Sequence, residues 1–112
     1  MLFACSGAAD VGLLADQTAR ALTKQGLGKM YCLAGVGGKI PSMIERVRSS
    51  GRRVAIDGCP SDCAKHSLLG SGIQEFDHIR LYEHGFEKGK TSVTQDSIAR
   101  AAALVQSELA VK

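Results

Sequence analysis

The sequence has 112 residues, of which 45% are hydrophobic and 22% are charged, as is usual for a soluble globular protein, so a disordered chain is not indicated. This length supports one hydrophobic core, and we expect a single domain over residues 1–112. The formal net charge is only +3, with lysines and arginines spread along the chain and few aromatic residues, which argues against nucleic-acid binding.

Neither a signal peptide nor a membrane segment is predicted. The first residues lack a basic opening followed by a long apolar stretch, and no apolar run approaches the roughly 20 residues that span a bilayer. We therefore expect a cytoplasmic protein without membrane contact. In that reducing compartment, the four cysteines are more often metal ligands, redox groups or small buried side chains than disulfide partners.

Short apolar runs alternate with longer segments of helical spacing, which is typical of βαβ units. The predicted strands are residues 2–5, 29–33, 53–57 and 78–83. This order predicts an α/β fold: a small three-layer domain with a mostly parallel four-stranded sheet built from Rossmann-like βα units.

Two helices are predicted between the first three strands. Apolar residues at helical spacing predict the first, which should end before Gly26. The second is predicted from the apolar positions between Ile40 and Val47, with Pro41 in its first turn and Gly51 just beyond its end.

Two more helices complete the pattern. The third should start at Pro60 and stop by Gly70 or Gly72. In the last helix, Thr94 is the expected N-cap, and Asp96 in the first turn suits the positive end of the helix.

The cysteines follow this repeating unit. Cys5, Cys32 and Cys59 recur at one regular interval, each near the end of a predicted strand. Successive parallel strands end at the same side of a sheet, so we expect these cysteines at its C-terminal edge. Cys63 follows Cys59 by one helical turn, and if Pro60 opens the helix, both thiols lie at its positive start, which favours thiolates.

This arrangement predicts a metal site with Cys5, Cys32, Cys59 and Cys63 as ligands. Four thiolates suit zinc, but they suit an iron–sulfur cluster equally well, and the plainer interpretation is four small buried side chains. A site filled by four protein ligands leaves no position for an activated water, so a structural or carrier role is favoured over an enzyme. A thiol redox protein using Cys59 and Cys63 is the alternative.

Other polar residues are weaker candidates. His84 should follow the fourth strand on the cysteine side and is the best substitute ligand, although an exposed loop histidine is the plainer interpretation. His66 lies one turn beyond Cys63, either as a hydrogen-bond donor to a ligand or exposed. Asp57 is either an orienting carboxylate or an ordinary turn residue. His78 opens a strand at the opposite edge, and no role is assigned to it.

The stretch IDGCPSDCAKHSLLGSGI, together with CSGAADVG and CLAGVGG, resembles the DGC domain family, which is named for Asp57, Gly58 and Cys59 as they stand here. The resemblance covers nearly the whole chain. It implies a zinc-binding domain with the four cysteines as chelating residues, and it implies no particular reaction. The sequence leaves open whether a protein partner binds at the metal site.

Overall fold

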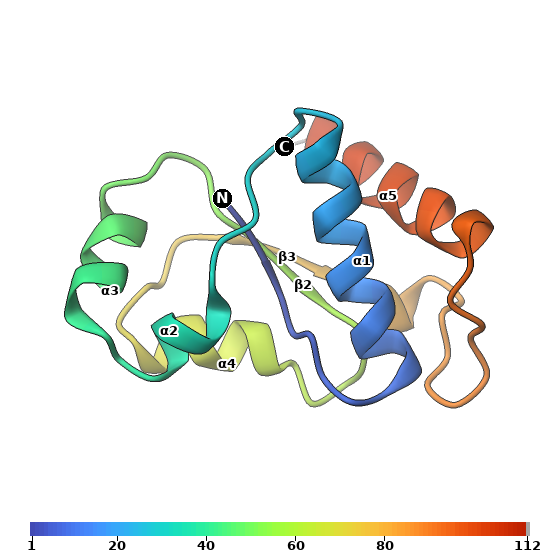
Figure 1. The fold of residues 1–112 in the computed structure, drawn as a ribbon, viewed down its shortest axis with the longest axis horizontal. Coiled ribbons are helices and arrows are strands. Elements are labelled where there is room, and N and C mark those ends of the chain that lie inside the picture. The colour runs from blue at the N-terminus through green and yellow to red at the C-terminus, as the bar shows by residue number, and fades with distance from the viewer. Residues whose placement is uncertain (112) are drawn as a thin grey trace.

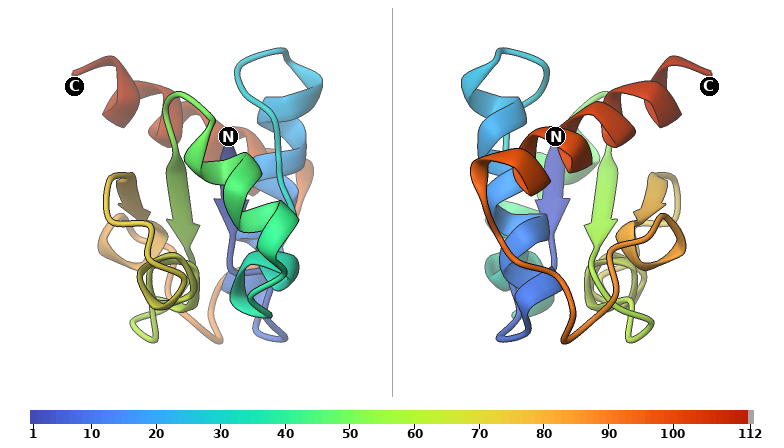
Figure 2. Two further views of the ribbon diagram at one scale, coloured as in Figure 1. Left: turned by 90° about the vertical axis from the view of Figure 1, so that its left-hand side faces the viewer. Right: turned by 90° about the vertical axis from the view of Figure 1, so that its right-hand side faces the viewer.

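A parallel sheet of three strands runs through the middle of the protein, which we describe from a computed structural model over residues 1–111 (Figure 1). The strands are β1 (Leu2–Ala4), β2 (Val54–Asp57) and β3 (Asp77–Arg80), in the spatial order β1, β2, β3. β1 and β2 point in the same direction (Figure 2). The register pairs Phe3 with Ala55 and Ala55 with His78.

The helices of the described residues are α1 (Asp10–Lys24), α2 (Leu33–Gly37), α3 (Pro41–Arg48), α4 (Cys63–Gly70), the 3-10 turn η1 (Leu81–Glu83) and α5 (Gln95–Ala110). The predictions of α1, α3 and α5 are confirmed. Pro41 opens α3, and Thr94 caps α5 through a reciprocal pair of hydrogen bonds with Ser97. None of these helices has the length and apolar character of a membrane span.

Helices cover both faces of the sheet. Successive strand residues point to opposite sides, so each strand contributes side chains to both layers of the core. Leu2 and Ile56 pack with apolar residues of α1 and α5 in one core cluster, and Figure 1 shows these two helices side by side. Phe3 and Ala55 pack in a second cluster with buried residues of α2, α3 and α4. β1 and β2 are mostly apolar and fully buried, because both of their faces are covered, whereas β3 is a polar, partly buried strand.

The predicted four-stranded sheet is wrong, because residues 29–33 do not form a strand. They make a single parallel bridge, between Leu2 and Met30. Leu2 donates to the carbonyl of Lys29 and Tyr31 donates to the carbonyl of Leu2. The chain then turns into α2 at Leu33, so the ladder ends before a second pair can form.

The expectation that the cysteines lie at a strand edge is also wrong. Cys5 and Cys59 lie in the loops that follow β1 and β2. Cys32 is the N-cap of α2, and Cys63 is the first residue of α4. The regular interval therefore reflects similar segment lengths and not equivalent strand ends.

Two predicted boundaries shift for local reasons. Helix α4 begins at Cys63 and not at Pro60, because residues 59–62 form a turn in which the Asp62 N–H donates to the carbonyl of Cys59. Asp62 is left-handed, with φ 50° and ψ 46°, and this conformation cannot continue a helix. The last strand ends at Arg80, where η1 begins.

Candidate functional site

A pocket of about 450 Å³, the thiol pocket, brings together three of the four cysteines. Cys5 reaches it from the loop after β1, Cys32 from the start of α2 and Cys63 from the start of α4. The remaining lining residues are Ala4, Ser6, Asp16, Arg20, Met30, Tyr31, Leu33, Ala34, Gly37 and Ser67. Segments far apart in the sequence thus present thiols to one space, as the metal-site hypothesis requires.

Cys5 is held against the sheet. Its N–H donates to the carbonyl of Ile56, 3.2 Å away, and its side chain packs against both core clusters. Burial raises the pKa of the Cys5 thiol, and the neighbouring Asp57 and Cys59 add to the rise. The N–H groups of Gly58 and Gly7 act in the opposite direction and offset part of the shift. Cys59, in the loop that follows β2, is not among the residues that line this pocket.

Cys32 and Cys63 are the exposed members of the set. The Cys32 sulfur accepts a hydrogen bond from the N–H of Gly35 at 3.4 Å, which caps the short helix α2. Cys63 also lines a neighbouring groove with His66. Both thiols can therefore be reached from solvent.

The four sulfurs do not form a closed tetrahedron in this structure. Within residues 1–111, no three cysteine sulfurs lie within 4.8 Å of one another. A zinc ion at about 2.3 Å from each sulfur would bring the sulfurs to roughly 3.8 Å apart. The donor chemistry suits a thiophilic metal, and closing the set around one ion requires the segments that carry the cysteines to move inward.

A cluster of three polar side chains lies beside the loop that carries Cys59. The ligand atoms of Asp57, Asp62 and His78 all lie within 4.8 Å of one another, and Asp57 is fully buried. His78 Nε2 lies 2.7 Å from Oδ2 of Asp57 and 3.7 Å from Oδ1 of Asp62. Tyr82 donates its hydroxyl hydrogen to Asp62, with oxygen separations of 3.0 Å and 3.2 Å. None of these side chains lines the pocket of Cys5, Cys32 and Cys63 or the groove beside Cys63 and His66.

The assignment of no role to His78 therefore missed a feature of the site. His78 lies within β3, and its ring reaches back to the end of β2. No short spacing in the sequence joins it to Asp57, because the two residues are on different strands. The other histidines are separate: His84 lies 3.5 Å from Glu108 of α5, away from the thiol pocket, and His66 lines the groove beside Cys63.

One wall of the thiol pocket carries an ion pair. Arg20 donates to Asp16 at 2.7 Å, and Ser6 donates to the same carboxylate at 2.8 Å. Partial burial opposes ionisation of Asp16, but the hydrogen bonds from Arg20 and Ser6 outweigh it, and the pKa of Asp16 is lowered. The wall therefore stays charged and polar beside Cys5 and Cys32.

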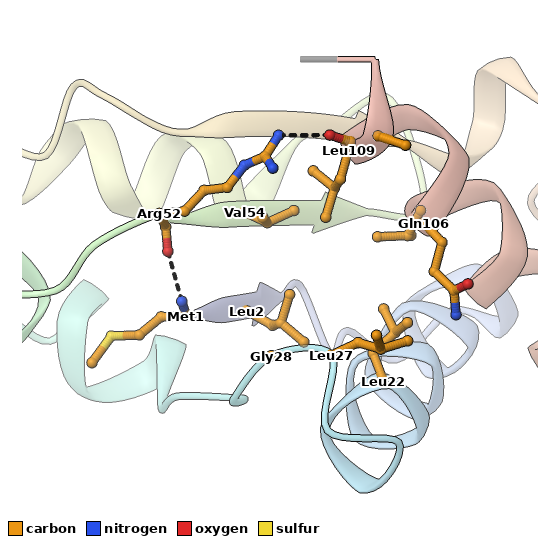
Figure 3. Close-up of a pocket in the computed structure, with 11 residues that line it drawn as sticks. Met1, Leu2, Leu22, Leu27, Gly28, Arg52, Val54, Gln106 and Leu109 are labelled. Atoms are coloured by element: carbon orange, nitrogen blue, oxygen red, sulfur yellow. Dashed lines mark hydrogen bonds between the residues drawn. The ribbon is translucent and has the colours of Figure 1, made fainter.

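A second pocket, of about 390 Å³, lies where β1 and β2 begin (Figure 3). It is mainly aliphatic, with side chains that include Leu2, Leu22 and Leu109. Arg52 at its rim pairs with Asp77 and donates to the carbonyl of Leu109, so its charge is already neutralised. The residues that line this pocket provide no thiol, imidazole or carboxylate. The thiol pocket is therefore the candidate functional site.

Comparison with known proteins identifies the family of this chain. The family model of the DGC domain matches residues 1–105. The chain belongs to the DGC domain family. It is 38% identical over 99 residues to the anaerobic and virulence modulator AnvM of Pseudomonas aeruginosa, a match that covers 87% of this chain and 76% of AnvM. No solved structure matches the chain.

Proposed function

We propose that this DGC-domain chain is a cytoplasmic metal-binding protein that holds zinc through the thiolates of its four cysteines. The supporting observation is the shared pocket: Cys5, Cys32 and Cys63 come from three separate segments and line one space. Cys59 follows β2, the strand that pairs in parallel with β1, and Cys5 follows β1. Because random placement of cysteines would not gather exposed and half-buried thiols from distant segments, this convergence favours a ligand set over simple packing.

The role is binding, with no reaction assigned. Zinc bound by four protein ligands acts as a cross-link between the loop after β1, the start of α2 and the start of α4. The raised pKa of Cys5 means that metal uptake must displace its proton, so affinity should increase as the pH rises. The exposed sulfurs of Cys32 and Cys63 provide the entry side.

An iron–sulfur or thiol redox centre is the second candidate. The spacing of the sulfurs, with no three within 4.8 Å among residues 1–111, is wider than a zinc tetrahedron and leaves room for a larger centre. The related AnvM is named as an anaerobic and virulence modulator. A similar role for this chain would suit an oxygen-sensitive centre in which Cys59 and Cys63 take part.

Metal analysis by mass spectrometry, on protein purified anaerobically without added metal, separates these candidates. We expect about one zinc per chain and loss of most of it in Cys59→Ser, with loss of bound zinc lowering the unfolding temperature. Ser67→Ala, at another position lining the same pocket, is the control and should keep its metal. Iron with visible absorption would favour the second candidate, and unchanged metal content in Cys59→Ser would reject the four-cysteine site.

A further inference from the structure

The turn between β2 and α4 carries two of the proposed ligands, yet it has little regular structure of its own. Within the turn, the main-chain contact is the hydrogen bond from the Asp62 N–H to the carbonyl of Cys59. Gly58 packs directly on the first turn of α1, where an added Cβ would collide with the backbone carbonyl group of Val11. The position of the turn is therefore fixed by its neighbours.

Asp57 replaces the normal N-cap of α4. The N-cap residue itself, Asp62, makes no capping hydrogen bond. Instead, Asp57 accepts hydrogen bonds from the N–H groups of Ala64 at 2.8 Å and Lys65 at 3.1 Å. These are free donors of the first helical turn, directly after Cys63. The buried carboxylate thus ties the start of α4 to the end of β2.

Two residues of the β3 region hold these carboxylates in place. His78, with a side chain only 10% exposed, donates from Nε2 to Asp57 at 2.7 Å, because an ionised carboxylate can only accept. Tyr82 donates to the carboxylate of Asp62, which makes no capping hydrogen bond to the helix start. Each carboxylate that brackets the turn therefore has an anchor on a distant segment.

We propose that His78 and Tyr82 are positioning residues, which act through Asp57 and Asp62 to hold the thiols of Cys59 and Cys63 in place for a common metal ion. This inference rests on the proposed metal-binding function and deepens it. Neither residue touches the metal. Their effect is to fix the two ends of the turn, so that two of the four ligands need little ordering when the ion binds.

The test is zinc affinity, measured by competition with a chromophoric chelator, for the wild type, Tyr82→Phe, His78→Leu and His78→Gln. Tyr82→Phe removes only the hydroxyl group, and His78→Gln can return a donor to the position of Nε2. We expect about 10- to 100-fold weaker zinc binding in Tyr82→Phe and His78→Leu, with partial recovery in His78→Gln. His84→Leu is the matched control and should bind as the wild type does.

A second measurement separates positioning from a general loss of stability. In metal-free protein, the alkylation rate of each cysteine is followed by mass spectrometry. Several-fold changes confined to Cys59 and Cys63 in Tyr82→Phe support the proposal, whereas equal acceleration at all four cysteines overturns it. Wild-type zinc affinity in Tyr82→Phe and His78→Leu also overturns it and leaves the proposed function intact. Wild-type protein that takes up no zinc rejects the proposed function, and this inference with it.

Discussion

Two cysteine-bearing segments of this protein are held in different ways. Residues 57–65, with Cys59 and Cys63, are tied to the sheet by a fully buried carboxylate and packed against α1 at Gly58. Residues 29–37, with Cys32, attach to the sheet through one β-bridge and form a five-residue helix. The first segment is therefore held by buried polar contacts, whereas the second is held by one β-bridge and by the apolar packing of Val36 in the second core cluster.

This difference indicates which half of the proposed site is preorganised. Buried polar contacts fix one conformation because breaking them leaves unsatisfied groups away from water. Cys32 is exposed, and its sulfur makes one long capping hydrogen bond. If a metal draws the sulfurs together, most of the movement should therefore occur on the Cys32 side, toward a Cys59 and Cys63 pair that is already placed.

The strongest challenge to this comparison is removal of the Asp57 carboxylate. Asp57→Ala should lower the free energy of unfolding of the metal-free protein by about 3–5 kcal/mol, because it strands a buried imidazole and two helix N–H groups. Urea denaturation measures the loss. Asp96→Ala removes a carboxylate that is 80% exposed and pairs with Arg100, and it should change stability little. Similar losses in the two variants would contradict the special role of Asp57.

Substitution of one glycine in each segment should lower stability by a smaller amount, and by a different amount in the two segments. Gly58→Ala should destabilise the fold by about 1–3 kcal/mol, because the new methyl group meets the backbone of Val11, which cannot easily move. Gly35→Ala should be better tolerated, since its methyl group meets the flexible thioether end of Met43. Thermal unfolding compares them, with Gly51→Ala as the control in open space. A greater loss in Gly35→Ala would reverse the comparison.

The ionisation of Tyr82 reports on the anchored segment directly. Partial burial, and then the hydrogen bond and charge of Asp62, raise the pKa of Tyr82 from 10.0 to about 12. The folded state thus binds this proton more tightly than the unfolded state. The associated stability is fully present below pH 10 and is lost as the pH rises toward about 12.

Tyrosinate absorbance can follow this ionisation in Tyr31→Phe, where Tyr82 is the one remaining tyrosine. We expect a late transition, and Asp62→Asn should move it to lower pH because the negative charge is lost. A transition at the ordinary tyrosine pKa, with no response to Asp62→Asn, would show that the contact to Asp62 does not persist in solution.

The smallest effect on stability is expected for substitution of the exposed Cys32. Cys32→Ser should change the unfolding free energy of metal-free protein by no more than about 0.5 kcal/mol, because the side chain is exposed and serine also caps a helix start. Chemical denaturation checks this value. The same variant should lose metal affinity if Cys32 is a ligand, so an unchanged affinity would remove it from the proposed set.

Local sequence determined much of the fold. Apolar residues at helical spacing predicted α1, α3 and α5, and Pro41 and Thr94 located two of the helix starts, because caps and periodicity act within one or two turns. The motif around Asp57, Gly58 and Cys59, together with CSGAADVG and CLAGVGG, predicted the DGC family, which the family match confirms.

Only the tertiary structure decided the number of strands and the surroundings of the cysteines. Residues 29–33 have the composition of a strand, but capping by Cys32 and the start of α2 leave them one bridge. The contacts of His78 and Tyr82 with Asp57 and Asp62 join residues about 20 positions apart and depend on how β3 lies beside β2. Periodicity reports which side of an element is buried, whereas the polar partners of a buried group depend on which elements become neighbours.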